Sequence, residues 1–314
     1  MRVFVAGGTG AVGKRLIPQL LDAGHQVVAI TRREDRAGEL RRRGAEAIVC
    51  DVFDADRLAQ AVRAAAPAAI VNQLTDLPAA MDPRLVEAAY ARNNRVRREG
   101  TRNLLAAASA ASVPRFIVQS MATWYRPEGG RIKEESDPLW TDAPEPLGAA
   151  VRTVADMEAA VLSGAATGIV LRYGGFYGPG TWYEPGGDVA EKLRARKFPV
   201  IGSGAAVTSF VHVHDAASAV VAALAGPPGI YNIVDDEPAP ASEWGPAASA
   251  AVGAPPPRRI PAILARLVVG KAFTAWMTTM RGASNAKAKR ELGWTPRYAS
   301  WRTGLAEAVT TEAP

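Results

Sequence analysis

The sequence predicts an α/β protein built on a doubly wound parallel sheet, with a smaller unit toward the C-terminus. Short apolar runs alternate with helical patterns as far as Arg172, which is typical of parallel strands joined by crossover helices. A glycine-rich turn joins the first apolar run to the first helical pattern, and the chain becomes turn-rich after Arg172. At 314 residues the chain is long enough for one large α/β unit and a smaller one.

The first strand is expected at residues 3–6, and it runs into a glycine-rich turn and a helix. That order builds a pyrophosphate site, because glycines let backbone N–H groups approach the phosphates and the helix dipole favours negative charge. A tight turn without a ligand is the alternative. The turn residues assigned to the site are Gly7, Thr9, Gly10, Ala11, Val12 and Gly13.

The other strands are expected where short apolar runs are bounded by turn residues. A helix is expected at residues 56–66 and a long one from about 83 to 111, and Asp215 is expected to cap a helix. The apolar segment 260–280 is interpreted as core or as a lid over a pocket. The expected strands are residues 26–30, 47–50, 69–72, 115–119, 168–172, 210–213 and 229–234.

Composition excludes several classes of protein. The net charge of +6 comes largely from arginine clusters, without a basic stripe interleaved with aromatic residues, so nucleic-acid binding is not expected. Arg266 and Lys271 interrupt the longest apolar stretch, which argues against a membrane span. The first strand begins almost at Met1, so no leader is expected, and the single Cys50 fits a buried thiol in a reducing compartment. We therefore expect a cytoplasmic protein without a bound metal, and its oligomeric state stays open.

Six motifs, in the family's order along nearly the whole chain, resemble the extended short-chain dehydrogenase/reductases of the NAD(P)-dependent epimerase/dehydratase-like superfamily. The resemblance implies a Rossmann domain from residues 1–172 and about 205–235, with a substrate-binding domain or lid from about 173–204 and 236–314. The motifs are the turn at 7–13, Asp51-Val52, the run GTRNLL at 100–105, Leu171-Arg172 with YGPG at 177–180, FVHVHD at 210–215, and AKAKRELGWTP at 286–296.

The end of the second strand indicates which nicotinamide cofactor binds. NAD-selective members of the family place a carboxylate there, whereas this chain has Thr31 followed by Arg32 and Arg33. Two guanidinium groups favour the 2′-phosphate of NADP(H), and a pair of surface arginines is the alternative. The resemblance implies that Asp51 accepts from the adenine amino group; a turn role is the alternative. The same resemblance adds further residues to the predicted cofactor site, namely Val52, Gln73, Leu74, Gln119, Ser120, Tyr173, Gly174 and Phe176.

The active site departs from the family pattern. Family enzymes use a Ser or Thr after the fifth strand, with a Tyr as acid/base and a Lys four residues later on the next helix. Glu158 matches the glutamate that follows this motif, and the three slots then hold Met121, Ala150 and Val154. Strand alternation turns the neighbouring Ser120 to the opposite side of the strand. The triad is therefore expected to be absent.

Loss of the triad leaves hydride transfer possible, because orientation against a nicotinamide supplies most of the chemistry. A ketone substrate then needs another proton source. The pattern is similar to the triad-lacking ketoreductases of angucyclinone tailoring, as in simocyclinone biosynthesis, which implies that the substrate supplies the proton. Water or a protein side chain is the alternative proton source. For one candidate, His212, packing at the domain junction is the alternative role. The candidate protein donors are Thr123, Tyr125, Tyr177, Lys133 and His212.

The substrate pocket is expected to be wide and aromatic, which suits a flat apolar molecule. Gly174-Gly175 stands where relatives carry bulkier residues, so a roomier floor is expected there. Aromatic residues that only join the two domains are the alternative. The expected substrate contacts are Met121, Trp124, Tyr125, Tyr177 and Trp182.

These features predict an NADP(H)-dependent oxidoreductase, most simply an atypical ketoreductase acting on an aromatic or polyketide-like carbonyl in natural-product biosynthesis. A catalytically silent NADP(H)-binding redox sensor or scaffold is the alternative, because such a protein would also lack the triad. A conventional sugar-nucleotide epimerase or dehydratase is disfavoured by the missing tyrosine.

Overall fold

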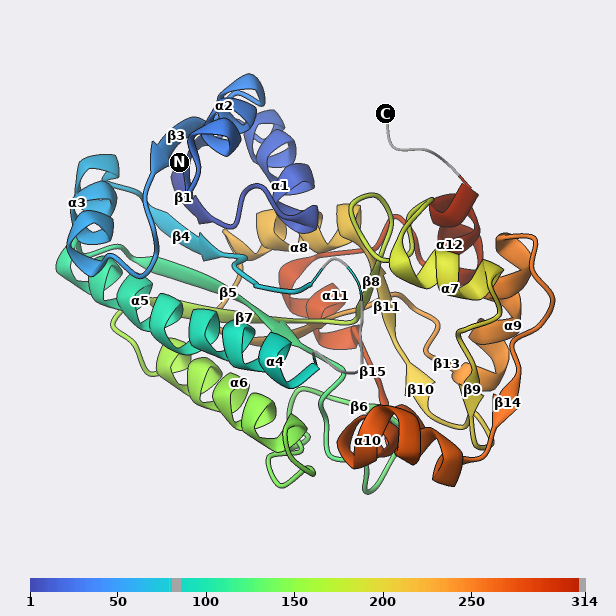
Figure 1. The fold of residues 1–314 in the computed structure, drawn as a ribbon. Helices are drawn as coiled ribbons and strands as arrows, with labels where there is room; N and C mark the ends of the chain where they lie inside the picture. The colour runs from blue at the N-terminus through green and yellow to red at the C-terminus, as the bar shows by residue number, and fades with distance from the viewer. Residues whose placement is uncertain (79, 81–85, 311–314) are drawn as a thin grey trace.

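A seven-stranded parallel sheet forms the centre of the molecule, in the order β12-β7-β5-β4-β1-β2-β3 (Figure 1). The computed structural model describes residues 1–78, 80 and 86–310. The chain reverses its direction of travel across the sheet between β1 and β4, which opens a crevice at their carboxyl ends. The predicted doubly wound sheet is confirmed. The strands are β1 (Arg2–Ala6), β2 (Gln26–Thr31), β3 (Glu46–Val49), β4 (Ala69–Asn72), β5 (Arg115–Met121), β7 (Thr167–Tyr173) and β12 (Gly229–Ile233).

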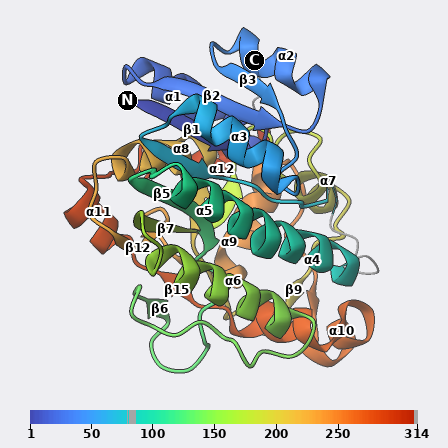
Figure 2. The same cartoon turned by 90° about the vertical axis from the view of Figure 1, so that its left-hand side faces the viewer.

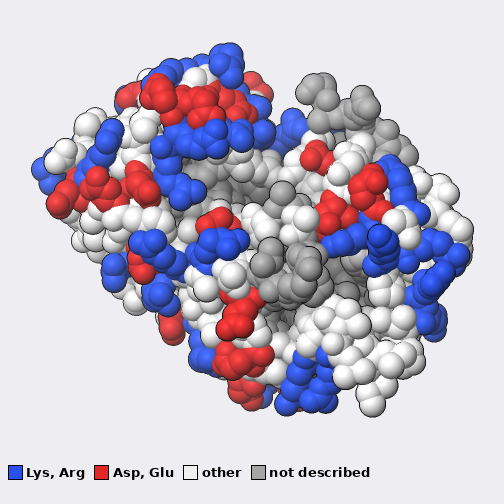
Figure 3. Space-filling model, viewed as in Figure 1, with Lys and Arg blue, Asp and Glu red and all other residues white. Residues whose placement is uncertain are grey.

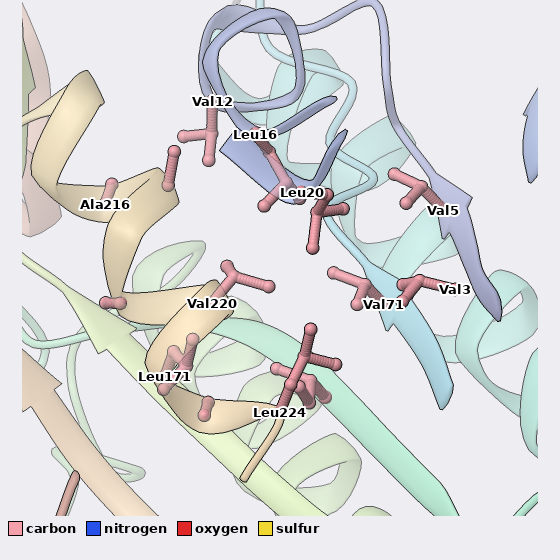
Figure 4. Packing of buried hydrophobic residues seen from close by; sticks show 14 of the residues in the cluster. Val3, Val5, Val12, Leu16, Leu20, Val71, Leu171, Ala216, Val220 and Leu224 are labelled. Carbon is pink, nitrogen blue, oxygen red and sulfur yellow. The ribbon is translucent and has the colours of Figure 1, made fainter. Parts of the chain in front are cut away.

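Helices cover both faces of this sheet, because successive strand residues point to opposite sides. From β1, Val3 and Val5 join the cluster formed with α1 and α8, as Figure 4 shows, whereas Phe4 and Ala6 join the cluster on the other face. On that other face α3, α5 and α6 lie side by side (Figure 2). The covering helices are α1 (Ala11–Asp22), α2 (Glu34–Arg42), α3 (Ala55–Ala65), α5 (Thr101–Ala110), α6 (Leu147–Leu162) and α8 (Val213–Ala223).

The long helix expected from about 83 to 111 is interrupted by a wider turn. It consists of α4 (Val86–Arg95), the π-helical turn η2 (Val96–Gly100) and then α5. Residues 83–85 of the expected helix lie outside the described residues. Single π-helical turns inside α-helices are rare and are found often at functional sites. This one carries Arg97, which is buried.

The helix after β11 (Phe210–His212) begins earlier than the sequence predicted, and Asp215 does not cap it. His212 is the N-cap residue, and its Nδ1 accepts from the backbone N–H of His214. The Asp215 carboxylate instead accepts from the backbone N–H groups of Arg297 and Tyr298, at 3.0 and 2.8 Å. Its partners lie about 80 residues away in the chain, so they could not be read from the local pattern.

The smaller unit is built from short strand pairs and helices around an aromatic core that includes Tyr177, Phe210, Trp244 and Trp301. It lies beside the carboxyl ends of the central strands (Figure 1). Its strands, with the strand pair that borders it, are β8 (Gly175–Tyr177), β9 (Val200–Ile201), β10 (Val207–Thr208), β13 (Ala239–Pro240), β14 (Arg259–Ile260), β6 (Ile132–Lys133) and β15 (Gly282–Ala283). Its helices are α7 (Asp188–Arg194), α9 (Ala241–Ala251), α10 (Ala262–Thr279) and α12 (Trp301–Thr310), and α11 (Ala286–Leu292) returns to the large sheet.

Helix α10 agrees only in part with the expected core or lid segment. Gly270 interrupts it with φ +80°, so its two halves differ in environment. The second half packs inward, and Trp276 Nε1 donates to the carbonyl of Thr123 at 3.0 Å. The first half leaves Ile263 and Leu267 exposed, so it is not core. Across the described residues, none of the helices combines the length and apolarity needed to cross a bilayer.

We expect Asp215→Ala to lower the free energy of unfolding by about 2–4 kcal/mol, because two backbone N–H groups lose a charged and buried acceptor. Denaturant unfolding measures the change. Asp156→Ala on the exposed face of α6 is the matched control, with an expected change within about 0.5 kcal/mol. Equal stability of the two variants would show that Asp215 does not fasten the C-terminal segment.

Candidate functional site

The three spaced glycines after β1 serve three different purposes. Gly7 has φ +94°, and a Cβ there would lie 2.6 Å from the backbone of Gln73. A Cβ at Gly13 would lie 2.2 Å from the Gly7 carbonyl oxygen, so this glycine lets α1 pack directly onto the turn. A Cβ at Gly10 would meet only that same oxygen, at 3.5 Å. Gly10 therefore faces open space, where a ligand can approach the backbone.

The N-terminus of α1 is suited to an anion. Its N-cap residue, Gly10, gives no side-chain cap, and the first turn carries no acidic residue. The first N–H groups of a helix have no partner within the helix, so those of Ala11, Val12 and Gly13 are available to a phosphate. The Val12 side chain is buried in the core, and only its backbone can serve the site. The partly exposed Thr9 borders the same turn.

The two arginines after β2 are not equivalent. The Arg33 guanidinium donates to both carboxylate oxygens of Asp35, at 2.9 and 2.5 Å, and is largely exposed. Arg32 is exposed, and within the described part of the chain its guanidinium has no hydrogen-bond or ion-pair partner. Arg32 is therefore the residue available for a 2′-phosphate beside Thr31.

The other residues predicted to contact the adenosine half of the cofactor stabilise the turns of the chain in that region. Asp51 Oδ1 accepts from the N–H of Phe53 at 3.0 Å, which is the turn role left open by the sequence. Val52 is buried, and it lies against Gly100 so closely that a Cβ on Gly100 would be 3.2 Å away. The carbonyl of Val52 accepts from Asn103 Nδ2. One Asp51 carboxylate oxygen is left for a ligand.

Gln73, Leu74 and Tyr173 form the wall behind the glycine turn. Gln73 Nε2 donates to the Tyr173 hydroxyl at 3.3 Å, and that hydroxyl donates to the carbonyl of Ala216 at 3.2 Å. Tyr173 is fully buried, so its side chain holds the wall in place and does not reach a ligand. The Leu74 N–H is taken by Asn72 Oδ1.

The three slots of the family triad form an apolar surface. Met121 is partly exposed at the end of β5, whereas Ala150 and Val154 on α6 are fully buried. All three belong to one apolar cluster. None of these side chains can give a proton to a reacting oxygen.

A buried polar network lies behind this apolar surface. Glu158 accepts from Arg172 Nε and Nη2 at 2.9 and 2.5 Å, and also from the Ser120 hydroxyl. Ser120 therefore faces α6, the helix that also carries Ala150 and Val154, and its neighbour Gln119 is also buried. The network continues because Arg172 Nη1 donates to the Tyr125 hydroxyl, which donates to Asn232 Oδ1 at 2.7 Å.

The structure argues against Tyr125 and Tyr177 as proton donors and as substrate contacts, because both are buried. Burial is the main cause that raises the pKa of Tyr125 to about 12. Burial, with nearby carboxylates, also raises the pKa of Tyr177 far above its usual range. Neither phenol matches the pKa needed for proton transfer near neutral pH.

Two further proton-donor candidates have structural roles. Lys133 Nζ donates to the carbonyl of Glu128 and to Asp137, and the side chain is 3% exposed. His212 stacks on Tyr298 with ring centroids 3.9 Å apart, which is the packing role that the sequence left open. Burial lowers the pKa of His212 to about 4, so the imidazole is neutral.

The residues expected to line the substrate pocket divide into accessible and packed groups. Trp124 is buried between Tyr90 and Arg97 and belongs to the core. Trp182 is partly exposed, and its Nε1 donates to the Pro78 carbonyl at 3.1 Å, which joins the two halves of the molecule. Thr123 is buried, and its hydroxyl has no hydrogen-bond partner among the described residues. Met121 and Trp182 are the expected contacts that are exposed in part.

The roomier floor expected at Gly174-Gly175 is wrong at Gly174, whereas a Cβ on Gly175 would only touch the Phe210 ring, at 3.4 Å. A Cβ on Gly174 would lie 2.5 Å from the carbonyl oxygen of Ser209. The space that a side chain would take is filled by the strand that pairs with β8. Phe176 lies partly buried against Tyr173, with ring centroids 5.2 Å apart. These glycines serve the joint between the sheet and the smaller unit.

Sequence reasoning missed Arg97 and Asn232. Asn232 is a polar residue inside the apolar run of β12, and that interruption was a signal of a buried partner. Arg97 stands in the arginine-rich stretch RVRREG, where no local pattern distinguishes it from exposed neighbours such as Arg98.

The surface around the crevice carries mixed charge. On the face in Figure 3, the described basic and acidic side chains alternate around a hollow between the two halves of the molecule. The described residues contain no group of three or more His, Cys, Asp or Glu side chains that could bind a metal ion.

Comparison with known proteins adds a family and several relatives. The model of the NAD dependent epimerase/dehydratase family matches residues 3–233. A 3-diazoavenalumate denitrifying reductase of a Streptomyces species is 45% identical over 307 residues, covering 97% of this chain and 99% of the relative. A 4-hydroxy-2-methyl-3-oxo-4-farnesyl-3,4-dihydroquinoline-1-oxide ketoreductase of Stigmatella aurantiaca is 27% identical, covering 76% of this chain and 69% of the relative.

Solved structures share the fold. The UDP-glucose 4-epimerase of Thermotoga maritima, solved with UDP-glucose, matches with a TM-score of 0.75 and 20% identity, covering 98% of this chain and 97% of that one. A human epimerase family protein, solved with NADPH, matches with a TM-score of 0.76 and 21% identity, covering 98% and 99%. At such low identity these likenesses support the fold alone.

We expect Gly10→Val and Gly13→Val to fail in different ways. Gly10→Val should fold but lose at least about 10-fold in cofactor affinity, because its side chain enters the open space before α1. Gly13→Val should lose stability first, because its Cβ cannot fit against the turn. Thermal unfolding and cofactor titration separate the two effects. A folded Gly10→Val protein with unchanged affinity would show that the turn does not hold the phosphates.

Proposed function

The chain belongs to the NAD dependent epimerase/dehydratase family, and on this premise we propose that it is an NADPH-dependent reductase that replaces the diazo group of an aromatic substrate by hydrogen. The observation that carries the proposal is the apolar triad surface of Met121, Ala150 and Val154, where no side chain can donate a proton. The relative named a diazo-compound denitrifying reductase, at 45% identity over nearly the whole chain, supports the same reaction class.

The residues present fit a dinucleotide. Gly10 leaves room for a pyrophosphate at the N-terminus of α1, and Arg32, beside the end of β2, is a cation with no partner among the described residues. Arg32 supports NADP(H) over NAD(H), because a carboxylate at this place would repel a 2′-phosphate. When bound, NADPH supplies a hydride, which forms the new C–H bond while dinitrogen leaves with the electron pair of the C–N bond.

Proton balance separates this reaction from the reduction of a carbonyl. A ketone that accepts hydride becomes an alkoxide and needs a proton, which the family tyrosine normally gives. An aryl diazonium group that accepts hydride becomes a neutral arene and dinitrogen, so no proton is needed. The partly exposed Met121 would then contact the aromatic ring, and the buried Ala150 and Val154 would exclude water behind it.

An atypical ketoreductase is the second candidate, acting on an aromatic or polyketide-like carbonyl of natural-product biosynthesis. The relative named a ketoreductase, at 27% identity, favours it. The triad-lacking angucyclinone ketoreductases suggest how it would work, with the proton supplied by a hydroxyl of the substrate. A catalytically silent NADP(H)-binding sensor is the remaining alternative, and it predicts binding without turnover.

The assignment of separate parts of the chain to the cofactor and to the substrate is part of the proposal. Residues 1–172 and about 205–235 would bind the cofactor, and about 173–204 and 236–314 would bind or cover the substrate. We further propose that the protein acts in the cytoplasm on a small aromatic molecule, without a nucleic-acid or membrane partner.

We expect Arg32→Asp to weaken NADPH binding by about 2 kcal/mol or more, because a charge-assisted contact is replaced by repulsion. Fluorescence titration of NADPH and NADH against both proteins measures the change. Arg33→Gln is the matched control, because Arg33 is already paired with Asp35, and it should bind NADPH nearly as well as the wild type. Equal affinity of the wild type for the two cofactors would contradict the role of Arg32.

We expect the protein to convert diazotised 3-aminobenzoate to benzoate, with one NADPH consumed for each dinitrogen released. The rate above the uncatalysed background should be nearly constant between about pH 6 and 8, because no protein acid takes part. His212, with its pKa lowered to about 4, stays neutral, and Tyr125, with its pKa raised to about 12, stays protonated across this range. Product chromatography and NADPH absorbance measure the reaction.

The competing functions give other outcomes in the same assay. Reduction of an aromatic ketone with a neighbouring phenol, but of no diazo compound, would favour the ketoreductase. Its methyl ether should then react far more slowly. Thr123→Val tests the remaining buried hydroxyl, and a loss of more than about 100-fold would identify a protein acid after all. NADPH binding without any turnover would favour the sensor.

A further inference from the structure

Arg97 is a buried cation that forms no ion pair within the described residues. It lies on the π-helical turn η2 and is 4% exposed. Its Nη1 is buried and has no hydrogen-bond partner in the part of the chain that the structure describes. Within the described residues, no carboxylate lies within ion-pairing distance of its guanidinium. Its nearest aromatic partner is Trp124, with the guanidinium carbon 5.1 Å from the ring centroid.

The surroundings of Arg97 compensate its charge only in part. Burial lowers the pKa of Arg97 to about 10, so the guanidinium still carries its proton near neutral pH. The one buried carboxylate that influences it, Glu158, is already bound to Arg172 and Ser120. A cation–π contact contributes less than a paired anion. A buried charge without a partner is unfavourable, so its presence calls for a ligand or another explanation.

Arg97 lies beside the apolar triad surface. Trp124, which its guanidinium covers, belongs to the same apolar cluster as Met121, Ala150 and Val154. Tyr90 packs edge-on against Trp124 in that cluster, at 6.4 Å between ring centroids. The apolar cluster that contains the three triad slots therefore has a cation at its border, and Met121 is the slot residue through which a flat substrate could reach it.

We propose that Arg97 binds an anionic oxygen of the aromatic substrate, a carboxylate or a phenolate, and so makes the enzyme selective for anionic substrates. The planar fork of a guanidinium matches a carboxylate with two parallel hydrogen bonds, and in an apolar setting such bonds are strong. Nη1 is the donor left without a partner for this purpose. The inference rests on the proposed function only in assuming that the substrate is aromatic. It does not depend on which reaction the enzyme performs on that substrate.

Binding of unreactive ligands tests the inference without turnover. The probes are benzoate and pentafluorophenolate, with methyl benzoate and pentafluoroanisole as neutral counterparts, titrated with NADP⁺ present. We expect Arg97→Gln to bind the preferred anion at least about 10-fold more weakly while its neutral counterpart is unaffected. Arg98→Gln, an exposed arginine on the same turn, is the matched control and should change neither. The anion that binds more tightly to the wild type identifies the carboxylate or the phenolate.

Stability measurements separate this role from a structural one. Without ligand, Arg97→Met should have the same melting temperature as the wild type or a higher one, because it removes an unpaired buried charge. A clear loss of stability or of folded protein in the Met and Gln variants would assign Arg97 to packing and overturn the inference. Equal weakening of anionic and neutral probes, or weakened NADP⁺ binding, would overturn it too. Arg97-dependent binding of an anion, with no diazo reduction, would leave this inference standing and reject the proposed reaction.

Discussion

The buried ion pair between Arg172 and Glu158 organises the candidate active site. It joins β7 to α6, and through Ser120 it also engages β5. Both charges are nearly inaccessible to water, so each needs the other and the further hydrogen bonds that complete it. Removal of either partner would leave an uncompensated charge inside the protein. The pair therefore fixes the relative position of β5, β7 and α6, and with it the surface formed by Met121 and Val154.

The same network determines which polar groups remain available to a substrate. Tyr125 looks like a proton donor in the sequence, but its hydroxyl accepts from Arg172 and donates to Asn232. A phenol in such a chain of hydrogen bonds gains stability from its partners, and it loses the freedom to act as an acid. Arg97 is the contrasting case, because it is equally buried but its Nη1 finds no hydrogen-bond partner among the residues that the structure describes.

The sequence predicted the fold well wherever local pattern and burial agree. The strand at residues 69–72 has the expected bounds, because it is a short apolar run buried on both faces, and the glycine turn lies where strand and helix patterns meet. The sequence predicted the site less well, because its contacts join distant segments. Asn232 and Tyr125 are 107 residues apart, and the carbonyl of Ser209 fills the space at Gly174. Such partners have no local signature in the chain.

An apolar triad surface is consistent with a reaction whose main competitor is water. In the proposed reaction, a carbon that loses dinitrogen can be captured by hydride or by water, and only the first gives reduction. A hydroxyl or an ammonium group beside that carbon would attract ordered water. Ala150 and Val154 are fully buried and offer water no hydrogen bond, so in the proposed reaction they would keep water from the reacting carbon. The replacement of the family's tyrosine and lysine by Ala150 and Val154 removes the acid that a carbonyl reductase needs. In a diazo reductase the same replacement would also remove the water that competes with hydride.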